Sequence, residues 1–191
     1  MDVQAKALTI AALGDSLTAG FGLPGGQSFT AVLEKELRAR GRDVSVVNFG
    51  VSGDTTAGGV SRVKSVLASS PDGVILELGA NDGLRGLDPA QAEANLDRII
   101  AACKERGVPV LLMGMRTLAG MGKRYGEEFA AIYPRLAQKY GLMLYPFFLE
   151  GVAGNPALNL PDGLHPNYEG IREIVRRTAP TVEKWLDTIG K

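Results

Sequence analysis

This 191-residue chain has one cysteine and no net charge, and each of these absences excludes a structural feature or a class of partner. Cys103 is the only cysteine, so no internal disulfide is possible, and its apolar neighbours in a helix-like segment predict a buried small residue. The 21 basic residues are balanced by 21 acidic ones, which gives no electrostatic reason to expect a nucleic acid or an anionic membrane surface as partner. We therefore expect a small-molecule partner.

The sequence also lacks an apolar run long enough to cross a bilayer. The run over residues 7–13 is too short, and the polar residues 1–6 do not have the charged-then-apolar layout of a signal peptide. Ala5, Lys6 and Ala7 are compatible with the remnant of a removed signal, but too little chain precedes them to establish one. We expect no integral membrane segment, and the sequence leaves the compartment and the oligomeric state open.

Short apolar segments alternate along the chain with longer segments of helical periodicity. This alternation predicts a single α/β domain over residues 1–191, with a doubly wound sheet of five parallel strands. Among the common strand orders we expect 2-1-3-4-5. The predicted strands cover residues 8–13, 44–48, 74–78, 108–113 and 142–147, and the predicted helices cover residues 28–40, 56–69, 89–106, 123–140 and 167–189.

Polar, glycine-containing loops follow the first three predicted strands. Ser16 follows the first strand in Gly14-Asp15-Ser16-Leu17, Gly53 follows the second, and Asn81 follows the third. Ligands of open α/β sheets bind beyond the carboxyl ends of the strands, so these residues are candidates for a site. Taken singly, each also has an ordinary explanation, because a serine here can cap a helix and the other two suit tight turns.

A fourth loop, before the last predicted helix, carries Asp162 and His165, the only histidine of the chain. Across three residues of a tight turn, the carboxylate can reach imidazole Nδ1, which leaves Nε2 free to accept a proton. We expect Pro166 at the first position of the helix, holding the histidine in an extended conformation. The alternative is a surface histidine that caps the helix.

Together the four loops supply the parts of a serine hydrolase. Ser16 is the predicted nucleophile, and His165 is the predicted base, oriented by Asp162. The backbone N–H groups of Ser16 and Gly53, with the Asn81 amide, form the expected oxyanion hole, because neutral donors suit a charge that develops only in the tetrahedral intermediate. The predicted reaction is hydrolysis of an acyl ester through an acyl-enzyme.

At these residues the chain resembles the GDSL or SGNH hydrolase family, whose serine, glycine, asparagine and histidine fall here on Ser16, Gly53, Asn81 and His165. The motifs occur in order from about residue 8 to the final helix. Residues 47–55, 77–86 and 132–134 look closest to the arylesterase-like bacterial thioesterase I, protease I and lysophospholipase L1 branch. Ala80 and the loop over residues 114–122 depart from that pattern, and both are expected to line the acyl pocket.

The resemblance implies a flavodoxin-like three-layer α/β/α sandwich, the SGNH hydrolase fold, with no metal and no organic cofactor. It implies a serine esterase for short- to medium-chain acyl or aryl esters, with thioesters and lysophospholipids as further substrates. It also implies that Asp162 is the third member of the triad. A periplasmic or secreted protein is expected on the same ground.

Apolar side chains in the loops after the fourth and fifth strands are candidates for an acyl-binding wall, although some of them alternatively only cover the sheet edge. The candidate substrate-binding residues are Asp15, Met115, Leu118, Met121 and Leu158, with Phe148, Leu149 and Val152 as further members of the wall.

Three other functions remain open at the level of sequence. A carbohydrate O-deacetylase would use the same triad, but only 6% of residues are aromatic and Trp185 lies in the terminal helix, which disfavours a sugar platform. A magnesium-dependent phosphohydrolase would use the carboxylates of Asp15, Asp54, Asp82 and Asp162. A ligand-binding protein of the same fold would have no need of an oriented base.

Overall fold

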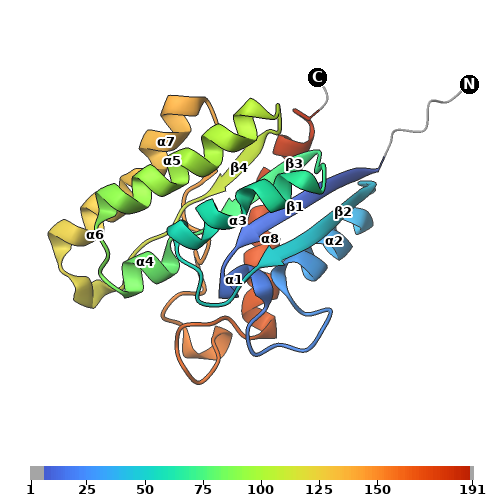
Figure 1. The fold of residues 1–191 in the computed structure, drawn as a ribbon. Coiled ribbons are helices and arrows are strands. Elements are labelled where there is room, and N and C mark those ends of the chain that lie inside the picture. Colours follow the sequence, from blue (N-terminus) through green and yellow to red (C-terminus); the bar gives the residue numbers. More distant parts are fainter. Residues whose placement is uncertain (1–6, 190–191) are drawn as a thin grey trace, which may run out of the picture.

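A sheet of five parallel strands runs through the computed structural model, which describes residues 7–189 apart from the side chain of Ala119 (Figure 1). The strands pair in the order β2-β1-β3-β4-β5, which confirms the predicted order. Residues 1–6, on which the question of a signal remnant rests, lie outside the described residues. The strands are β1 (Leu8–Gly14), β2 (Val44–Gly50), β3 (Gly73–Glu77), β4 (Val110–Met113) and β5 (Met143–Tyr145).

Helices cover both faces of the sheet and confirm the expected flavodoxin-like α/β/α fold (Figure 1). One face carries α2 and α8, which pack against each other, and the other carries α3, α5 and α7. No helix within residues 7–189 is long and apolar enough to cross a membrane. The helices are α1 (Ser16–Ala19), α2 (Phe29–Ala39), α3 (Thr56–Ala68), α4 (Ala80–Leu84), α5 (Pro89–Glu105), α6 (Lys123–Ala130), α7 (Ile132–Tyr140) and α8 (Tyr168–Leu186), with the 3-10 turns η1 (Ala119–Met121) and η2 (Pro156–Leu158).

The prediction of one helix over residues 123–140 is wrong. Two helices, α6 and α7, meet at Ala131, because Pro134 in the first turn of α7 has no N–H for the carbonyl of Ala130 and its ring crowds that carbonyl. The other predicted elements are present, with ends shifted by a few residues. The short helices α1 and α4, which directly follow β1 and β3, were not predicted.

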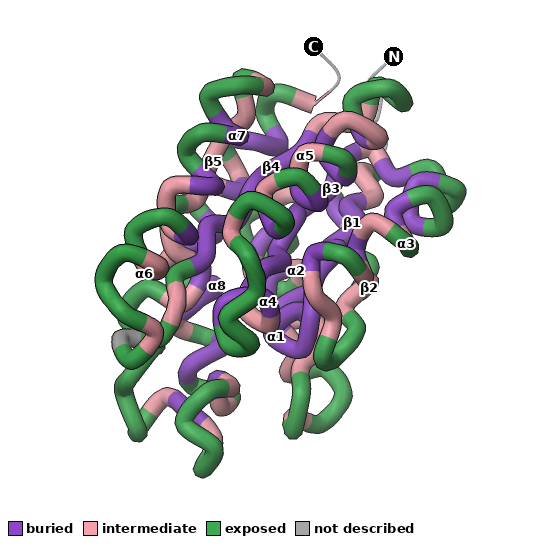
Figure 2. The backbone as a smooth tube through the Cα atoms, turned by 60° about the vertical axis from the view of Figure 1, so that its left-hand side comes forward, coloured by how far each residue is buried: buried purple, intermediate pink, exposed green. Residues whose placement is uncertain are grey.

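The apolar sequences of the central strands are explained by burial on both faces. Every residue of β3 and of β4 is buried, and the buried part of the chain runs through the middle of the molecule (Figure 2). One hydrophobic cluster joins these strands to the helices on both faces. Cys103 in α5 is fully buried, as predicted, and burial raises the pKa of its thiol to about 11.

The carboxyl ends of β1, β2 and β3 lie level with one another. Backbone pairing places Gly14 opposite Gly50 in β2 and opposite Glu77 in β3. The loops that follow these strands therefore leave the sheet side by side, at the end where Figure 1 shows α1 and α4. At Gly50 the backbone passes so close to α1 that an added Cβ would overlap the backbone nitrogen of Ala19.

We expect Gly50→Ala to lower the free energy of unfolding by about 1–3 kcal/mol, because the added methyl group meets backbone atoms rather than a mobile side chain. Urea denaturation of the variant and the wild-type protein measures the change. Gly25→Ala is the matched control, since an added Cβ there meets open space, and it should leave the midpoint nearly unchanged. Equal midpoints for Gly50→Ala and the wild type would contradict the close approach of β2 to α1.

Candidate active site

The turn after β1 presents Ser16 at the start of α1. The N-cap residue of this helix is Asp15, whose carboxylate accepts a hydrogen bond from the backbone N–H of Leu17 at 2.9 Å. The hydroxyl group of Ser16 is therefore free of the capping role that the sequence allowed, and it can serve another partner.

Three side chains from two distant parts of the chain form one row of hydrogen bonds. Ser16 Oγ lies 2.9 Å from His165 Nε2, and His165 Nδ1 lies 2.6 Å from Asp162 Oδ2. When Nδ1 carries the proton and donates it to the carboxylate, Nε2 can accept the proton of the serine. The structure thus brings the three predicted residues together in the geometry of a nucleophile with an oriented base.

The turn that carries Asp162 holds the imidazole through the backbone as well as through the side chain. Asp162 Oδ1 accepts hydrogen bonds from the backbone N–H groups of Leu164 at 2.9 Å and of His165 at 3.0 Å. The backbone N–H of His165 is the largest of the effects that lower the pKa of Asp162 to about 2. The carboxylate is therefore charged across the neutral range, facing the imidazole.

The prediction that Pro166 opens the last helix is wrong. The N-cap of α8 is Asn167, and Pro166 instead forms an antiparallel bridge with Asn159. The carbonyl of His165 accepts a hydrogen bond from the backbone N–H of Leu160 at 2.7 Å. His165 therefore does not cap α8, and its backbone is held by an extended turn.

Three neutral N–H donors come from the loops after β1, β2 and β3. Asn81 Nδ2 donates to the backbone carbonyl of Asp54 at 2.8 Å and to the carboxylate of Asp15 at 3.3 Å. Among residues 7–189, the backbone N–H groups of Ser16 and Gly53 have no hydrogen-bond acceptor. Gly53 has a φ of 83°, which favours glycine at this position. The predicted donors therefore lie in adjoining loops, and two of them are unengaged.

Two buried carboxyl groups lie beneath the serine turn. Asp15 and Glu77 are fully buried, and Thr18 Oγ1 donates to Glu77 Oε2 at 2.7 Å. In the described part of the chain, Glu77 Oε1 has no hydrogen-bond partner. Burial raises the pKa of Asp15 to about 7, and burial together with the nearby Asp15 carboxyl raises the pKa of Glu77 well above its usual value. Burial therefore disfavours the charged form of the Glu77 carboxyl group.

A cavity of about 240 Å³ opens beside Ser16, with Asn81 and His165 on its surface. Its wall is mainly apolar and includes the predicted residues Met115 and Leu118. Ala80 and residues 115–118 also lie on the wall, as expected for the two segments that depart from the pattern of the branch. The apolar side chains of the wall are those of Leu17, Ala80, Leu84, Met115, Leu118, Leu149, Ala153 and Leu164.

Other predicted members of the wall do not reach this cavity. Asp15 is buried beneath the serine turn, and Met121 lies near Gly86, where an added Cβ would be 3.1 Å from the terminal methyl group of the methionine. Phe148 and Val152 are fully buried members of the core. None of these four side chains lines the cavity beside Ser16, because Asp15, Phe148 and Val152 are buried and Met121 lies near Gly86.

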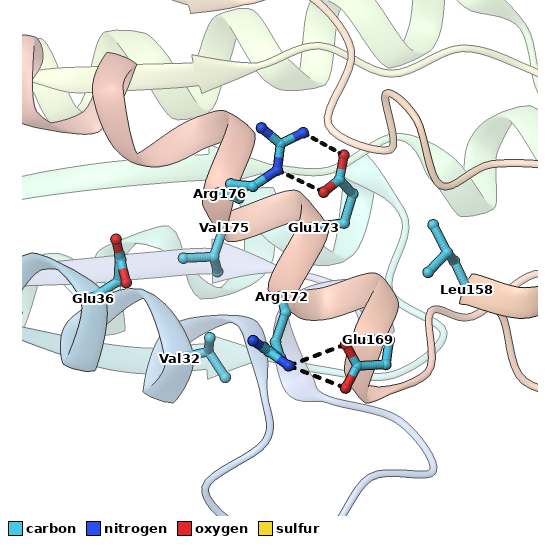
Figure 3. Close-up of a pocket in the computed structure, with 8 residues that line it drawn as sticks. All are labelled: Val32, Glu36, Leu158, Glu169, Arg172, Glu173, Val175 and Arg176. Atoms are coloured by element: carbon cyan, nitrogen blue, oxygen red, sulfur yellow. Dashed lines mark hydrogen bonds and ion pairs between the residues drawn. The ribbon is translucent and has the colours of Figure 1, made fainter.

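Leu158 lines a different hollow, between α2 and α8 (Figure 3). Most side chains around this hollow are charged, and several are paired along α8, Arg172 with Glu169 and Arg176 with Glu173. Leu158 is therefore not part of the wall of the cavity beside Ser16.

The four carboxylates that a magnesium site would need are engaged separately. Asp54 is paired with an arginine of α3, and Asp82 accepts hydrogen bonds from the backbone and the hydroxyl group of Thr56. Asp15 and Asp162 hold the serine and histidine turns. Within the described residues, no three His, Cys, Asp or Glu side chains are placed to hold a metal ion. The four carboxylates therefore do not act as one ligand set.

The sequence did not identify Phe21, whose ring lies against the imidazole of His165 with the two centroids 4.3 Å apart. It also did not identify Leu84 and Leu164 as members of the cavity wall. A single aromatic or leucine side chain in a loop or a short helix has no sequence spacing that distinguishes a site residue from a surface residue. Only its position in the structure could identify it.

Comparisons with known proteins match nearly the whole chain. A model of the GDSL-like Lipase/Acylhydrolase family matches residues 12–172. The chain is 42% identical to the arylesterase of Vibrio mimicus, over 91% of this chain and 88% of that protein. It is 39% identical to thioesterase 1/protease 1/lysophospholipase L1 of Escherichia coli K12, over 95% of this chain and 83% of that protein. The crystal structure of AlinE4, an SGNH-hydrolase family esterase, is 48% identical with a TM-score of 0.80, and the match covers 95% of this chain and 97% of that chain.

The raised pKa of Asp15 predicts a pH dependence of stability. Between about pH 4 and pH 7 the folded protein keeps a proton on Asp15 that the unfolded chain releases, so this group makes the free energy of unfolding fall as the pH rises. Asp15→Asn, which can still cap α1, should reduce that fall. Urea unfolding of both proteins at pH 4 and pH 7 measures the difference. An equal fall in the two proteins would contradict the raised pKa.

Proposed function

The chain belongs to the GDSL-like lipase/acylhydrolase family and is a carboxylic ester hydrolase, and we propose that it works through an acyl-enzyme on Ser16. The observation that carries the proposal is the row of hydrogen bonds from Ser16 through His165 to Asp162. The named relatives confirm the predicted family and branch, and they do not favour the deacetylase or the phosphohydrolase.

In the proposed mechanism, Ser16 Oγ attacks the carbonyl carbon of the ester while His165 Nε2 takes its proton. The imidazolium then gives that proton to the leaving alkoxide as the tetrahedral intermediate collapses to the acyl-enzyme. Water repeats the sequence on the acyl group, with His165 again as base. Asp162, held as a carboxylate by two backbone N–H groups, keeps Nδ1 protonated and stabilises the imidazolium.

The negative oxygen of the intermediate would be bound by the backbone N–H groups of Ser16 and Gly53 and by the amide of Asn81. The first two are unengaged among the described residues. Asn81 Nδ2 lies 2.8 Å from the carbonyl of Asp54 and 3.3 Å from Asp15, so its contact with Asp15 is the weaker one and can be exchanged for a contact with the substrate. Removing a donor of this kind costs about 3 kcal/mol of transition-state stabilisation in other hydrolases.

The mainly apolar cavity beside Ser16 supports an acyl group of short to medium length, or an aryl ester, as substrate. The relatives are named for aryl esters, thioesters and lysophospholipids, and we extend all three classes to this chain as candidate substrates. Each presents an acyl carbonyl to the same triad and differs only in the leaving group. The likeness to this branch also supports a periplasmic or secreted location.

Substitution of the triad tests the mechanism. Ser16→Ala and His165→Ala should each lower kcat for a p-nitrophenyl ester by roughly 10⁴-fold or more, because nucleophile and base act as one unit. An organophosphonate should label the wild-type protein stoichiometrically at Ser16. Ser69→Ala, which removes a hydroxyl group at the far end of α3, is the matched control and should keep full activity. Undiminished hydrolysis by His165→Ala would refute the proposed mechanism.

The cavity wall predicts which residues set acyl-chain preference. Leu118→Ala and Leu149→Ala should shift kcat/KM toward longer acyl chains, by roughly fourfold for each further methylene group that becomes buried. Met121→Ala and Leu158→Ala are matched controls, because neither side chain reaches the cavity. A series of acyl esters of graded length measures the preference. A shift in the controls but not in the wall variants would contradict this location of the acyl group.

A further inference from the structure

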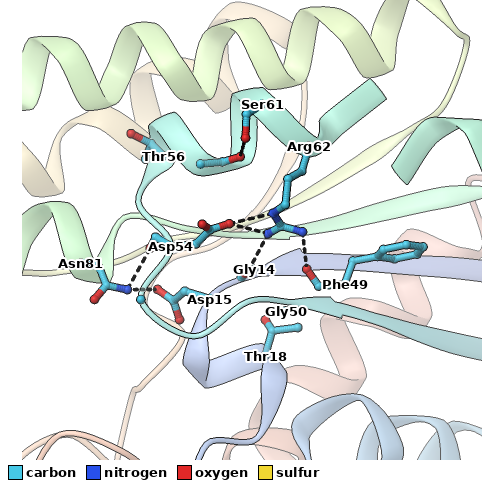
Figure 4. Close-up of polar contacts among 12 residues, drawn as sticks. Gly14, Asp15, Thr18, Phe49, Gly50, Asp54, Thr56, Ser61, Arg62 and Asn81 are labelled. Atoms are coloured by element: carbon cyan, nitrogen blue, oxygen red, sulfur yellow. Dashed lines mark hydrogen bonds and ion pairs between the residues drawn. The ribbon is translucent and has the colours of Figure 1, made fainter. Parts of the chain in front are cut away.

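The side chain of Arg62, on α3, joins the ends of β1 and β2 to the loop that follows β2 (Figure 4). Its Nη1 donates to the backbone carbonyl of Phe49 at 3.0 Å, and its Nη2 donates to that of Gly14 at 3.2 Å. Its Nε donates to Oδ2 of Asp54 at 2.8 Å, and Nη2 lies 2.6 Å from the same oxygen. One guanidinium group therefore contacts three segments of backbone or side chain that surround the serine turn.

Asp54 connects this guanidinium group to the proposed oxyanion donors. Gly53, whose N–H is one donor, directly precedes Asp54, and the carbonyl of Asp54 holds the amide of Asn81 at 2.8 Å. Gly14 ends β1 just before Asp15 and Ser16, which provides the third donor. A shift of Asp54 would consequently move two of the donors relative to the third.

We propose that Arg62 is a positioning residue of the oxyanion hole, which holds the Gly53 loop and the Asn81 amide in place against the serine turn. The inference rests on the proposed function. Arg62 does not line the cavity beside Ser16, so it acts through Asp54 rather than on the substrate. The side chains of Arg62 and Asp54 are 24% and 17% exposed, and this partial burial limits the screening of their attraction by water.

The shape of the guanidinium group suits this task. Its donors point in fixed, different directions, so it can bind two carbonyls and a carboxylate at once, which an ammonium group on a flexible stem does poorly. The carboxylate of Asp54 is closely fitted on its other side too, because an added Cβ at Gly58 would overlap it. Asp54 is thus held between the backbone of α3 and Arg62.

The test measures kcat and KM for a p-nitrophenyl ester in Arg62→Gln. We expect kcat to fall roughly 10- to 100-fold with KM changed less than about threefold, because the donors are displaced but not removed. The rate of inactivation by an organophosphonate should fall in parallel, since its phosphoryl oxygen needs the same donors. Arg62→Lys, which keeps the charge beside Asp54, should be intermediate.

Arg38→Gln is the matched control. Arg38 also donates to a carbonyl of β2, that of Val44 at 2.9 Å, and is also paired with a carboxylate, that of Glu34, but at the opposite end of the strand. Its kcat per labelled active site should stay within about twofold of the wild type, since it lies outside the catalytic machinery. In an Asn81→Ala background, Arg62→Gln should cost less than in the wild type, because one of the donors it positions is already gone.

The outcomes separate the inference from the proposed function. If Arg62→Gln and Arg38→Gln have the same kcat per phosphonate-labelled site, the inference about Arg62 is overturned and the proposed function stands. Should Arg62→Gln fail to fold, an unchanged kcat in Arg62→Lys overturns it equally. If Ser16→Ala hydrolyses the ester as the wild-type protein does in the same assay, both the proposed function and the inference are overturned.

Discussion

Gly14, Gly50 and Glu77 lie level with one another at the ends of β1, β2 and β3, because parallel pairing fixes the register of these strands. Ser16 and the candidate donors of the Gly53 loop and the Asn81 turn depend on this register. The serine turn, the Gly53 loop and the Asn81 turn leave the sheet side by side, so donors that are far apart in sequence adjoin in space. A displacement of one strand by a single residue would turn its side chains to the other face and separate the donors.

At the Ser16 turn and at the His165 turn, a nearby residue caps the helix, so Ser16 and His165 do not. Asp15 caps α1 next to Ser16, and Asn167 caps α8 next to the turn of His165. Ser16 and His165 are therefore left to bind each other. The division has a cost, because the capping carboxyl is buried near Glu77 and its pKa is raised. Ionisable groups with shifted pKa values are common at functional sites, where polar groups are held in buried positions.

Much of the fold and the site was predictable because both rest on short-range patterns. Buried strands appear as apolar runs, and polar loops follow the ends of the strands in a parallel sheet. Ser16, Gly53, Asn81 and the pair Asp162 and His165 could therefore be named as candidates from the sequence. The break at Ala131 was missed although Pro134 signals it, since apolar periodicity continues across the break. Members of the acyl wall were predicted less well, because neighbours in a loop can point in opposite directions.

The sequence by itself determined the fold class and the chemical groups of the predicted triad, because these depend on residue type and local spacing. The strand order was an expectation taken from the common orders of such sheets, and it was decided by the strand pairing in the structure. Only the tertiary structure decided that Leu149 faces the cavity while Met121 and Leu158 face elsewhere. It alone placed Arg62 against the ends of two strands and Phe21 against the imidazole. The packing of segments that are distant in sequence decides where a loop side chain points and which groups an arginine side chain contacts. No local sequence pattern contains that information.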